Sequence, residues 1–343
     1  MPTLHAVLPD AVHDRTRPSG GNTYDRRVLG GLTSLGWTVH EQLVTGRWPE
    51  PDAVGRRSLA DAVGRVGSGG PVLVDGLLAS RSPDVLVPLA RHAPLIVLVH
   101  LPLGGEPERA VLAAAAAVVT TSEWSRDRLV ALHGLDPARV HVAEPGTDPA
   151  PLAAGTPGSG SLLCVGAVTP LKGLDVLADA LATLTDLPWH CVVAGSLEVD
   201  ASFAADIVEG TRRAGIAGHV TFAGPLTVDA LGDAYAATDL LVAPSRVETY
   251  GMAVADALAR GLPVVASEVG GLPQTVQGVG GAVPGLLVPP GDPAALAQAL
   301  RTWLTDAGLR GRLRTAAAAR RDTLAPWAET ARRLAAVLRA LVP

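Results

Sequence analysis

Two acidic residues lie eight positions apart in the run PSRVETYGMAVADALARGLPVVAS, residues 244–267. Glu248 stands just before a helix that we expect to open at about Thr249, and Asp256 lies roughly two turns along it. A helix N-terminus presents unpaired N–H groups and a partial positive charge, which suit diphosphate or sugar oxygens. Gly251 in the first turn would let such a ligand approach the backbone closely. Taken alone, acids at this spacing more often mean a helix cap and a solvated side chain.

Three more residues have types that suit an anionic or sugar ligand. Lys172 is the only lysine among 28 basic side chains and lies in the turn sequence PLKG, which favours a phosphate contact over a solvated lysine. His100 ends an expected strand, where it either lines a site or caps backbone groups. Gly20 and Gly21 are expected on the loop after the first strand. Asn22, the only asparagine, follows them and either stabilises a turn or contacts a ligand.

The elements that must position these residues follow a regular rhythm. Short β-branched runs alternate with stretches rich in Ala and Leu, which is the pattern of a parallel sheet covered by helices. The expected strands form two sets of six, at residues 4–8, 38–43, 72–75, 95–100, 118–121 and 140–143, and at residues 162–166, 190–194, 220–223, 240–243, 264–267 and 285–288. Two such α/β domains in tandem place the carboxyl ends of two sheets where a ligand cleft can form.

A change of composition separates the two sets of strands. Residues 150–161, APLAAGTPGSGS, are rich in Gly, Pro and Ser, which is typical of a linker. We therefore expect an N-terminal domain over residues 1–153 and a C-terminal domain over residues 160–323. Residues 324–341, LAPWAETARRLAAVLRAL, predict an amphipathic helix that need not belong to the domain before it.

Composition excludes several classes of protein. A length of 343 residues suits two domains, and 48% hydrophobic against 18% charged residues describes a packed globular protein. With a net charge of −5 and no basic block, nucleic acid is not an expected partner. No run of about 18 uncharged apolar residues and no signal-peptide pattern occurs, so we expect no transmembrane segment and a cytoplasmic location. Cys164 and Cys191 are expected as buried free thiols, and no Cys/His spacing predicts a metal site.

The run at residues 244–267 resembles the signature of the retaining family 4 glycosyltransferases of the GT-B fold. That signature has Pro-Ser, a Glu, an aromatic–Gly pair, a second acid and then Ala-x-Gly-x-Pro-Val. Three other segments of the family's pattern occur in the family's order. Residues 162–181 resemble the phosphate-site strand, loop and helix, residues 220–245 the nucleoside-side segment, and residues 285–300 the closing segment. The N-terminal half matches more loosely, through PSGGNTYDRRV, VLVHLPLG and TTSEWSRDRL, at residues 18–28, 97–104 and 120–129. The resemblance covers nearly the whole chain.

The resemblance implies a role for each candidate residue. Glu248 would contact hydroxyls of the donor sugar, Asp256 would accept from the ribose hydroxyls, and Lys172 would neutralise the diphosphate. His100 would line the reaction centre. The other donor-binding positions, mostly backbone contacts, would be Gly20, Gly21, Asn22, Gly166, Thr249, Tyr250, Gly251, Met252 and Ala253.

The implied protein is a hexosyltransferase-type enzyme with two Rossmann-like α/β/α domains facing a central cleft. The first domain would bind the acceptor, the second the donor, and residues 324–343 would cross back onto the first. The donor would be a UDP- or GDP-linked sugar, used as co-substrate without a further cofactor or metal. The acceptor would be a small molecule, a glycan or a lipid-linked hydroxyl. Preorganised donors would stabilise the departing diphosphate, which itself would take the acceptor's proton.

Two positions depart from the family's pattern. Asp256 stands where the family has a Glu, one methylene longer. Ala167 stands where many relatives carry an Arg, and losing a guanidinium removes a bidentate phosphate ligand. Arg246 could replace that ligand, although a solvated side chain is its simpler state. A weakened relative that binds nucleotide sugars without transferring them therefore stays open.

Two different enzyme classes fit the residues less well. A dinucleotide-dependent oxidoreductase would share the Rossmann-like sheets, but no G-x-G-x-x-G follows either first strand with an acid about 20 positions on. A GT-B phosphorylase would need a lysine for a pyridoxal cofactor, and Lys172 is the sole lysine of the chain.

Overall fold

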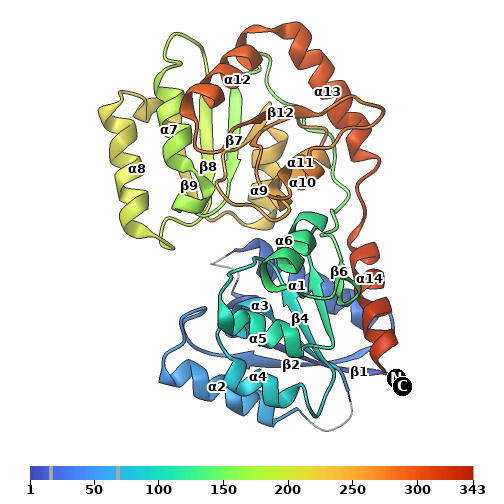
Figure 1. The fold of residues 1–343 in the computed structure, drawn as a ribbon. Coiled ribbons are helices and arrows are strands. Elements are labelled where there is room, and N and C mark those ends of the chain that lie inside the picture. Colours follow the sequence, from blue (N-terminus) through green and yellow to red (C-terminus); the bar gives the residue numbers. More distant parts are fainter. Residues whose placement is uncertain (15–17, 67–69, 343) are drawn as a thin grey trace. The chain divides into compact units, whose positions relative to one another are not determined.

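The computed structural model describes residues 1–14, 18–66 and 70–342 (Figure 1). Pro343, which ends the segment 324–343 that we expect to join the first domain, lies outside the described residues. Two compact units make up the chain. Unit 1 holds Met1–Asp14, Gly20–Gly146 and the segment from Ala325 onward, and unit 2 is built on Thr147–Leu324.

Unit 1 contains a six-stranded parallel sheet in the order β2-β1-β3-β4-β5-β6. Its strands are β1 Thr3–Pro9, β2 Thr38–Val44, β3 Val72–Asp75, β4 Leu95–Val99, β5 Ala117–Thr120 and β6 Val140–Val142. After β2 the chain returns across β1 to build the other side of the sheet, so the strand order reverses between β1 and β3. Ligands of open α/β sheets bind beyond the carboxyl ends of the strands at such a point.

Helices cover both faces of this sheet (Figure 1). They are α1 Gly20–Ser34, α2 Ala53–Gly64, α3 Gly76–Ala79, α4 Pro83–Leu89, α5 Glu106–Ala114, α6 Glu123–His133 and α14 Trp327–Leu341. Leu4, Ala6 and Leu8 of β1 belong to one apolar core, whereas Val7 belongs to the other. Burial on both faces explains why the strand is a continuous apolar run.

The last helix, α14, packs on α1 within unit 1 (Figure 1). A Cβ on Gly31 of α1 would lie 2.5 Å from the Cβ of Ala331, so this glycine permits the close approach. Thr330 Oγ1 also donates to the carbonyl oxygen of Glu144 (2.7 Å). The return of the final helix to the first domain is thereby confirmed. The helix begins at Trp327, three residues later than expected, because Pro326 takes an extended conformation and caps it.

Unit 2 contains a second six-stranded parallel sheet, in the order β12-β11-β10-β7-β8-β9. Its strands are β7 Ser161–Val165, β8 His190–Ala194, β9 Val220–Gly224, β10 Leu240–Ala243, β11 Val264–Ser267 and β12 Gly285–Val288. The strand order reverses between β7 and β10, so the loops that follow these two strands meet at one edge. The covering helices are α7 Leu174–Ala182, α8 Ala201–Arg213, α9 Val228–Ala236, α10 Met252–Leu258, α11 Leu272–Thr275, α12 Pro293–Thr305 and α13 Ala307–Arg321.

Residues 150–160 form no helix or strand, whereas Ser161 already begins β7, and the backbone of this segment is bound along unit 2. Ala153 N donates to the carbonyl oxygen of Arg260 (2.9 Å). Thr156 donates from its backbone N and its hydroxyl to the buried carboxylate of Asp239, at 2.8 and 2.6 Å. Gly155 has φ +65°, and a Cβ there would lie 2.6 Å from the same carboxylate. Gly155 thus allows the backbone of this segment to approach the Asp239 carboxylate closely.

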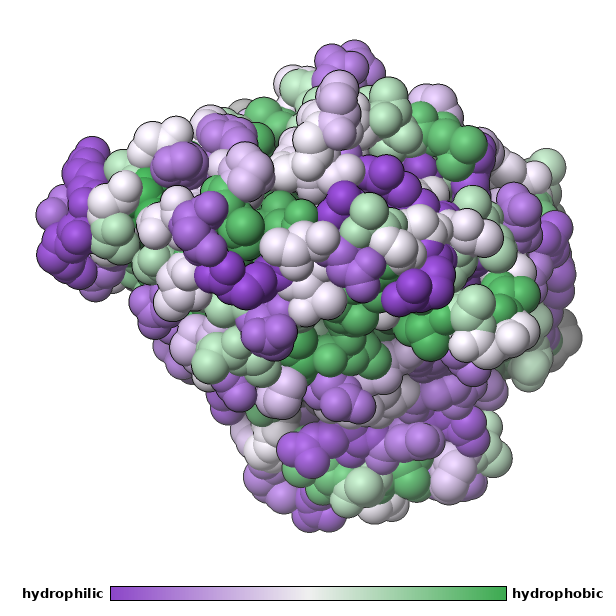
Figure 2. Space-filling view, turned by 90° about the horizontal axis from the view of Figure 1, so that it is seen from above, coloured by the Kyte–Doolittle hydropathy of each residue, from purple (hydrophilic) through white to green (hydrophobic). Residues whose placement is uncertain are grey.

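All twelve expected strands are present, each end within one residue of its expected place. The two cysteines are free and buried, as expected, and burial raises the pKa of the Cys164 thiol to about 12. On the face shown in Figure 2, hydrophilic and hydrophobic residues are intermixed. Within the described ranges, no helix is both long enough and apolar enough to cross a membrane.

Candidate functional site

The loop between β10 and α10 is tied to the loop that follows β7. Arg246 N donates to the carbonyl oxygen of Leu171 (2.8 Å). The Arg246 guanidinium donates to both carboxylate oxygens of Asp175, at 2.7 and 2.6 Å, and to the carbonyl oxygen of Pro170 (2.9 Å). The hydrogen bonds from Arg246 outweigh partial burial and lower the pKa of Asp175. The Arg246 guanidinium is therefore partly exposed but engaged by Asp175 and Pro170, so in this structure it does not stand in for the missing guanidinium at position 167.

Two glycines of the β11–α11 loop hold the other side of the same segment. A Cβ on Gly270 would lie 1.7 Å from the carbonyl oxygen of Glu248, and one on Gly271 would lie 2.1 Å from that of Thr249. Gly271 N donates to the Glu248 carbonyl oxygen (3.0 Å). No residue with a side chain fits at these contacts, so the backbone around Glu248 is clamped between two loops.

Lys172 and Glu248 are in direct contact. Lys172 follows β7 and Glu248 follows β10, which are neighbours in the sheet. Lys172 Nζ donates to Glu248 Oε2 (2.5 Å), and both side chains are partly buried. The lysine stem lies against Gly166, where a Cβ would be 3.3 Å from it. Gly173, with φ +67°, brings its loop against Pro244. Gly166, Lys172 and Glu248, which the sequence indicated separately, thus form one group.

The helix after Glu248 begins later than expected. Gly251 has φ +89° and is the cap before α10, which starts at Met252. Thr249 and Tyr250 therefore belong to the loop, and only Met252 and Ala253 among the expected positions lie in the first helical turn. The left-handed glycine closes the loop because an L side chain would be strained there.

Asp256 lies in α10, one turn beyond its start, and is half-buried. Its carbonyl oxygen accepts a hydrogen bond from Arg260 (2.8 Å). Arg260 stacks over the ring of Tyr235, 4.6 Å from its centroid, and the Tyr235 hydroxyl donates to the carbonyl oxygen of Ala253 (3.1 Å). Burial, and next the charge of Asp256, raise the pKa of Tyr235 well above its ordinary value.

In unit 1, Gly20 and Gly21, expected on the loop after β1, lie with Asn22 in the first turn of α1, which begins at Gly20. The expectation of a loop was wrong: the two glycines begin the helix, despite their low helix propensity. A Cβ on Gly21 would lie 3.2 Å from the His100 ring, so these two candidates are in contact. Asn22 Nδ2 donates to the carbonyl oxygen of Ala11 (2.9 Å) and holds the turn before the helix.

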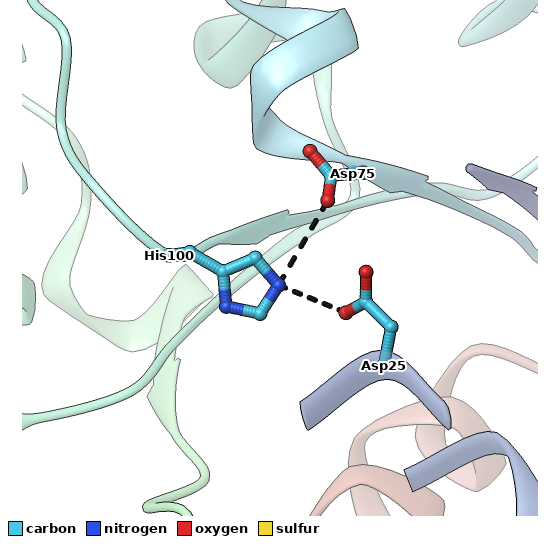
Figure 3. A group of neighbouring side chains, drawn as sticks. All are labelled: Asp25, Asp75 and His100. Atoms are coloured by element: carbon cyan, nitrogen blue, oxygen red, sulfur yellow. Dashed lines mark hydrogen bonds and ion pairs between the residues drawn. The ribbon is translucent and has the colours of Figure 1, made fainter. Parts of the chain in front are cut away.

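His100 lies between two carboxylates (Figure 3). Its Nε2 donates to Asp25 Oδ1 of α1 (2.8 Å) and lies 3.8 Å from Asp75 Oδ2 at the end of β3. Burial lowers the pKa of His100, but the charge and hydrogen bond of Asp25, with the charge of Asp75, together outweigh it and raise the pKa to about 9. Burial and the Asp25 charge raise the pKa of Asp75 to about 7. The ligand atoms of these three residues lie within 4.8 Å of one another, close enough for a metal ion by spacing alone.

A second buried network holds the loop that leaves His100. Glu108 of α5 accepts from the backbone N of Leu103 (3.1 Å) and of Gly104 (2.6 Å). It also accepts from His133 Nε2 of α6 (2.8 Å), and both side chains are buried. His100 is thus held by its contacts with Asp25 and Asp75, and the loop that follows it is held by Glu108.

Comparison with known proteins identifies the family. The family described as Glycosyl transferases group 1 matches residues 159–306. A D-inositol 3-phosphate glycosyltransferase of Catenulispora acidiphila is 36% identical, over 78% of this chain and 69% of that protein. The chain belongs to the group 1 glycosyl transferases. The matches of this glycosyltransferase to two further relatives span only 44% and 57% of those proteins.

Solved structures confirm the predicted GT-B fold of this group 1 glycosyltransferase. Sucrose-phosphate synthase of Thermosynechococcus elongatus has a TM-score of 0.80 at 22% identity and covers 99% of both chains. The Anabaena protein HepE, solved in complex with UDP and glucose, has a TM-score of 0.77 at 18% identity and covers 99% of this chain and all of its own. At these identities the likeness shows the fold.

Several residues of this glycosyltransferase that shape the candidate site were not found from sequence. Asp75 ends the apolar strand VLVD, and a polar residue at a strand end was a signal that could have been used. Asp25, Asp175 and the Gly270–Gly271 pair have no local signal, because their contacts depend on which strands are neighbours.

Proposed function

We propose that this chain transfers a hexosyl group from a UDP- or GDP-linked sugar to an acceptor hydroxyl, with retention of the anomeric configuration. The observation that carries the proposal is the contact of Lys172 with Glu248, at the point where the strand order of unit 2 reverses. A cation and an acid beside each other there match the two ends of a sugar diphosphate, one anionic and one rich in hydroxyls.

The proposed chemistry breaks the bond from the anomeric carbon to the diphosphate oxygen and forms one to the acceptor oxygen. Lys172 uses one ammonium N–H on Glu248, and its other two would donate to the departing diphosphate. Backbone N–H groups from Thr249 to Ala253 would donate to sugar and phosphate oxygens. Charge develops on the leaving oxygen, so donors already in place lower the barrier most. The leaving phosphate would take the acceptor's proton, and no metal would be needed.

The other candidate residues fall into proposed roles around this reaction. The Glu248 carboxylate would accept from the hydroxyls of the donor sugar, and Asp256 from the ribose hydroxyls. Residues 160–323 would form the donor-binding domain, and residues 1–153 with 324–343 the acceptor-binding domain. His100 and the neighbouring Gly21 would contact substrate at the reaction centre.

The name of the Catenulispora relative gives a first acceptor to test, because that protein is called a D-inositol 3-phosphate glycosyltransferase. The experiment incubates the purified protein with UDP- and GDP-sugars and with inositol phosphates, other polyols or no acceptor. Mass spectrometry detects the glycoside, NMR assigns its anomeric configuration, and a parallel set contains EDTA. Glu248→Gln is the matched control. Transfer by wild type and not by the control supports the proposal, whereas an inverted product contradicts retention.

A second candidate function, binding without transfer, is favoured by one observation. Ala167 supplies no guanidinium, and Arg246 is engaged by Asp175, so the diphosphate site has one cation fewer than the family's pattern. UDP binding measured by calorimetry, together with no product from any donor, would establish this second function.

A further inference from the structure

The group formed by Asp25, Asp75 and His100 carries an unusual charge balance. Asp25 and Asp75 have side chains that are 1% and 7% exposed, and His100 is 20% exposed. Within the described ranges, His100 is the ion-pair partner that both carboxylates share. If the imidazole were neutral, the buried Asp25 carboxylate would lie beside a second buried acid without a cation, which is unfavourable.

The ring of His100 is held in one orientation. Tyr24 packs edge-on against it, with ring centroids 5.2 Å apart, and Gly21 fills the space beside Cδ2. Nε2 faces the carboxylates, and Nδ1 lies on the side of the ring away from them (Figure 3). In the part of the chain that the structure describes, Nδ1 has no hydrogen-bond partner.

We propose that Asp25 and Asp75 are positioning residues that keep His100 protonated on both nitrogens, so that Nδ1–H is a cationic donor to a negatively charged substrate oxygen. The assignment of that oxygen to a substrate rests on the proposed function, whereas the protonation of His100 does not. A charged N–H donor binds a phosphate oxygen roughly twice as strongly as a neutral one. That oxygen belongs either to the diphosphate of the donor or to a phosphate on the acceptor.

The groups around His100 agree with this assignment. Asp25 and Tyr24 face it from α1, and Asp75 faces it from the end of β3. Burial raises the pKa of Tyr24 far above its ordinary range, despite the opposing charge of Arg333 on α14, so the phenol stays neutral. Asp25 Oδ2 is buried without a partner among the described residues, and a protonated Asp75 is the neighbour that can donate to it. The pKa of His100, raised to about 9, follows from the same contacts.

The test follows His100 by NMR in protein labelled with ¹³C-histidine, with the signal assigned from its loss in His100→Gln. In wild type the signal should stay near its imidazolium position through neutral pH and reach its titration midpoint at about pH 9. In Asp25→Asn its titration should fall by about two pH units or more, because the negative charge is lost and the hydrogen bond becomes one to a neutral amide oxygen. Glu41→Gln is the matched control, because it removes the partner of an exposed histidine, His13, in the same unit.

Three results would overturn the proposal. Wild-type His100 could titrate near the ordinary value of 6.5, or its titration could be unchanged in Asp25→Asn. A third such result is a stoichiometric metal in purified wild type that is lost in His100→Gln, which would make the group a metal site. If Asp25→Asn does not fold, Asp75→Asn should give a smaller shift in the same direction.

Ligand titrations separate the two sources of the oxygen. UDP alone should shift the His100 signal if the partner is the donor diphosphate, and inorganic phosphate added to UDP-saturated protein should shift it if the partner is an acceptor phosphate. No shift with either contradicts the donor role. Turnover assays on the same samples keep the conclusions apart: a raised titration without transfer from any nucleotide sugar contradicts the proposed function alone. Transfer with an ordinary His100 titration contradicts this inference alone.

Discussion

Replacing Arg246 with Ala should weaken UDP binding even though its guanidinium is bound to the protein. The side chain joins the loop that carries Glu248 to the first turn of α7 through the bidentate contact with Asp175, and to the loop that carries Lys172 through the carbonyl oxygen of Pro170. The two side chains are 37% and 36% exposed, so water screens the pair, and it contributes about 1 kcal/mol. If binding needs both loops in place, the dissociation constant for UDP rises by about fivefold. The unfolding temperature of unit 2 should fall by about 2–4 °C.

The assay is titration calorimetry with UDP on wild type, Arg246→Ala, Asp175→Asn and the double variant. If Arg246 acts by holding Asp175, both single variants lose affinity to a similar extent, and the double variant is no worse than either. Arg301→Ala is the matched control. Arg301 makes an equivalent bidentate pair with Asp186, at 2.7 and 2.9 Å, but ties α12 to the loop after α7. It should lower stability and leave UDP affinity unchanged.

One result would refute this reasoning. If Arg246 is instead the missing phosphate ligand, Asp175→Asn frees its guanidinium, and UDP then binds more tightly. Opposite signs for the two single variants would therefore show that Arg246 contacts the diphosphate.

Other substitutions have equally defined outcomes. Glu248→Ala should lower kcat by about 100-fold with an unchanged circular dichroism spectrum, because a transition-state hydrogen bond is lost, and activity within twofold of wild type would contradict its role. Lys172→Ala should reduce donor turnover more than Lys172→Arg, since charge matters more than shape there, and equal small effects in steady-state kinetics would make it a surface residue. Ala167→Arg should tighten UDP binding about tenfold by calorimetry, and no gain would mean that the loop has no room. The pKa of His100 is higher in the folded protein than its unfolded value of 6.5, so its stabilising effect is complete below pH 6.5 and is lost as pH rises through about 9. Calorimetric unfolding should show that decline in wild type and far less of it in His100→Gln.

The repeating pattern of the sequence predicted the fold well because it depends on local composition. Apolar runs bounded by turn residues define each of the twelve strands to within one residue. The helix after Glu248 was placed too early because nothing local shows that Gly251 adopts a left-handed conformation. Likewise, Gly20 and Gly21 suggested a loop, and the His100 ring beside Gly21 gives a reason for that glycine within a helix.

Contacts between loops that follow different strands could not be predicted from the sequence. Lys172 and Glu248 were each singled out by motif, but their contact follows from β7 and β10 being neighbours, which the strand sequence alone does not reveal. The same holds for Asp25, whose helix meets β3 and β4 only once the strand order is fixed. An acid without a local motif becomes informative when its spatial neighbours are known.

Helix α14 has a consequence for synthesis on the ribosome. Leu334 and Leu338 complete the apolar core around Val28 and Leu32 of α1, but the chain reaches them only after the whole of Thr147–Leu324. At a translation rate of about 5–20 residues per second, that gap lasts roughly 10 to 35 seconds. Unit 1 thus begins to leave the ribosome first but is completed last. Until α14 is synthesised, the apolar face of α1 around Val28 and Leu32 lacks the helix that covers it in the folded protein.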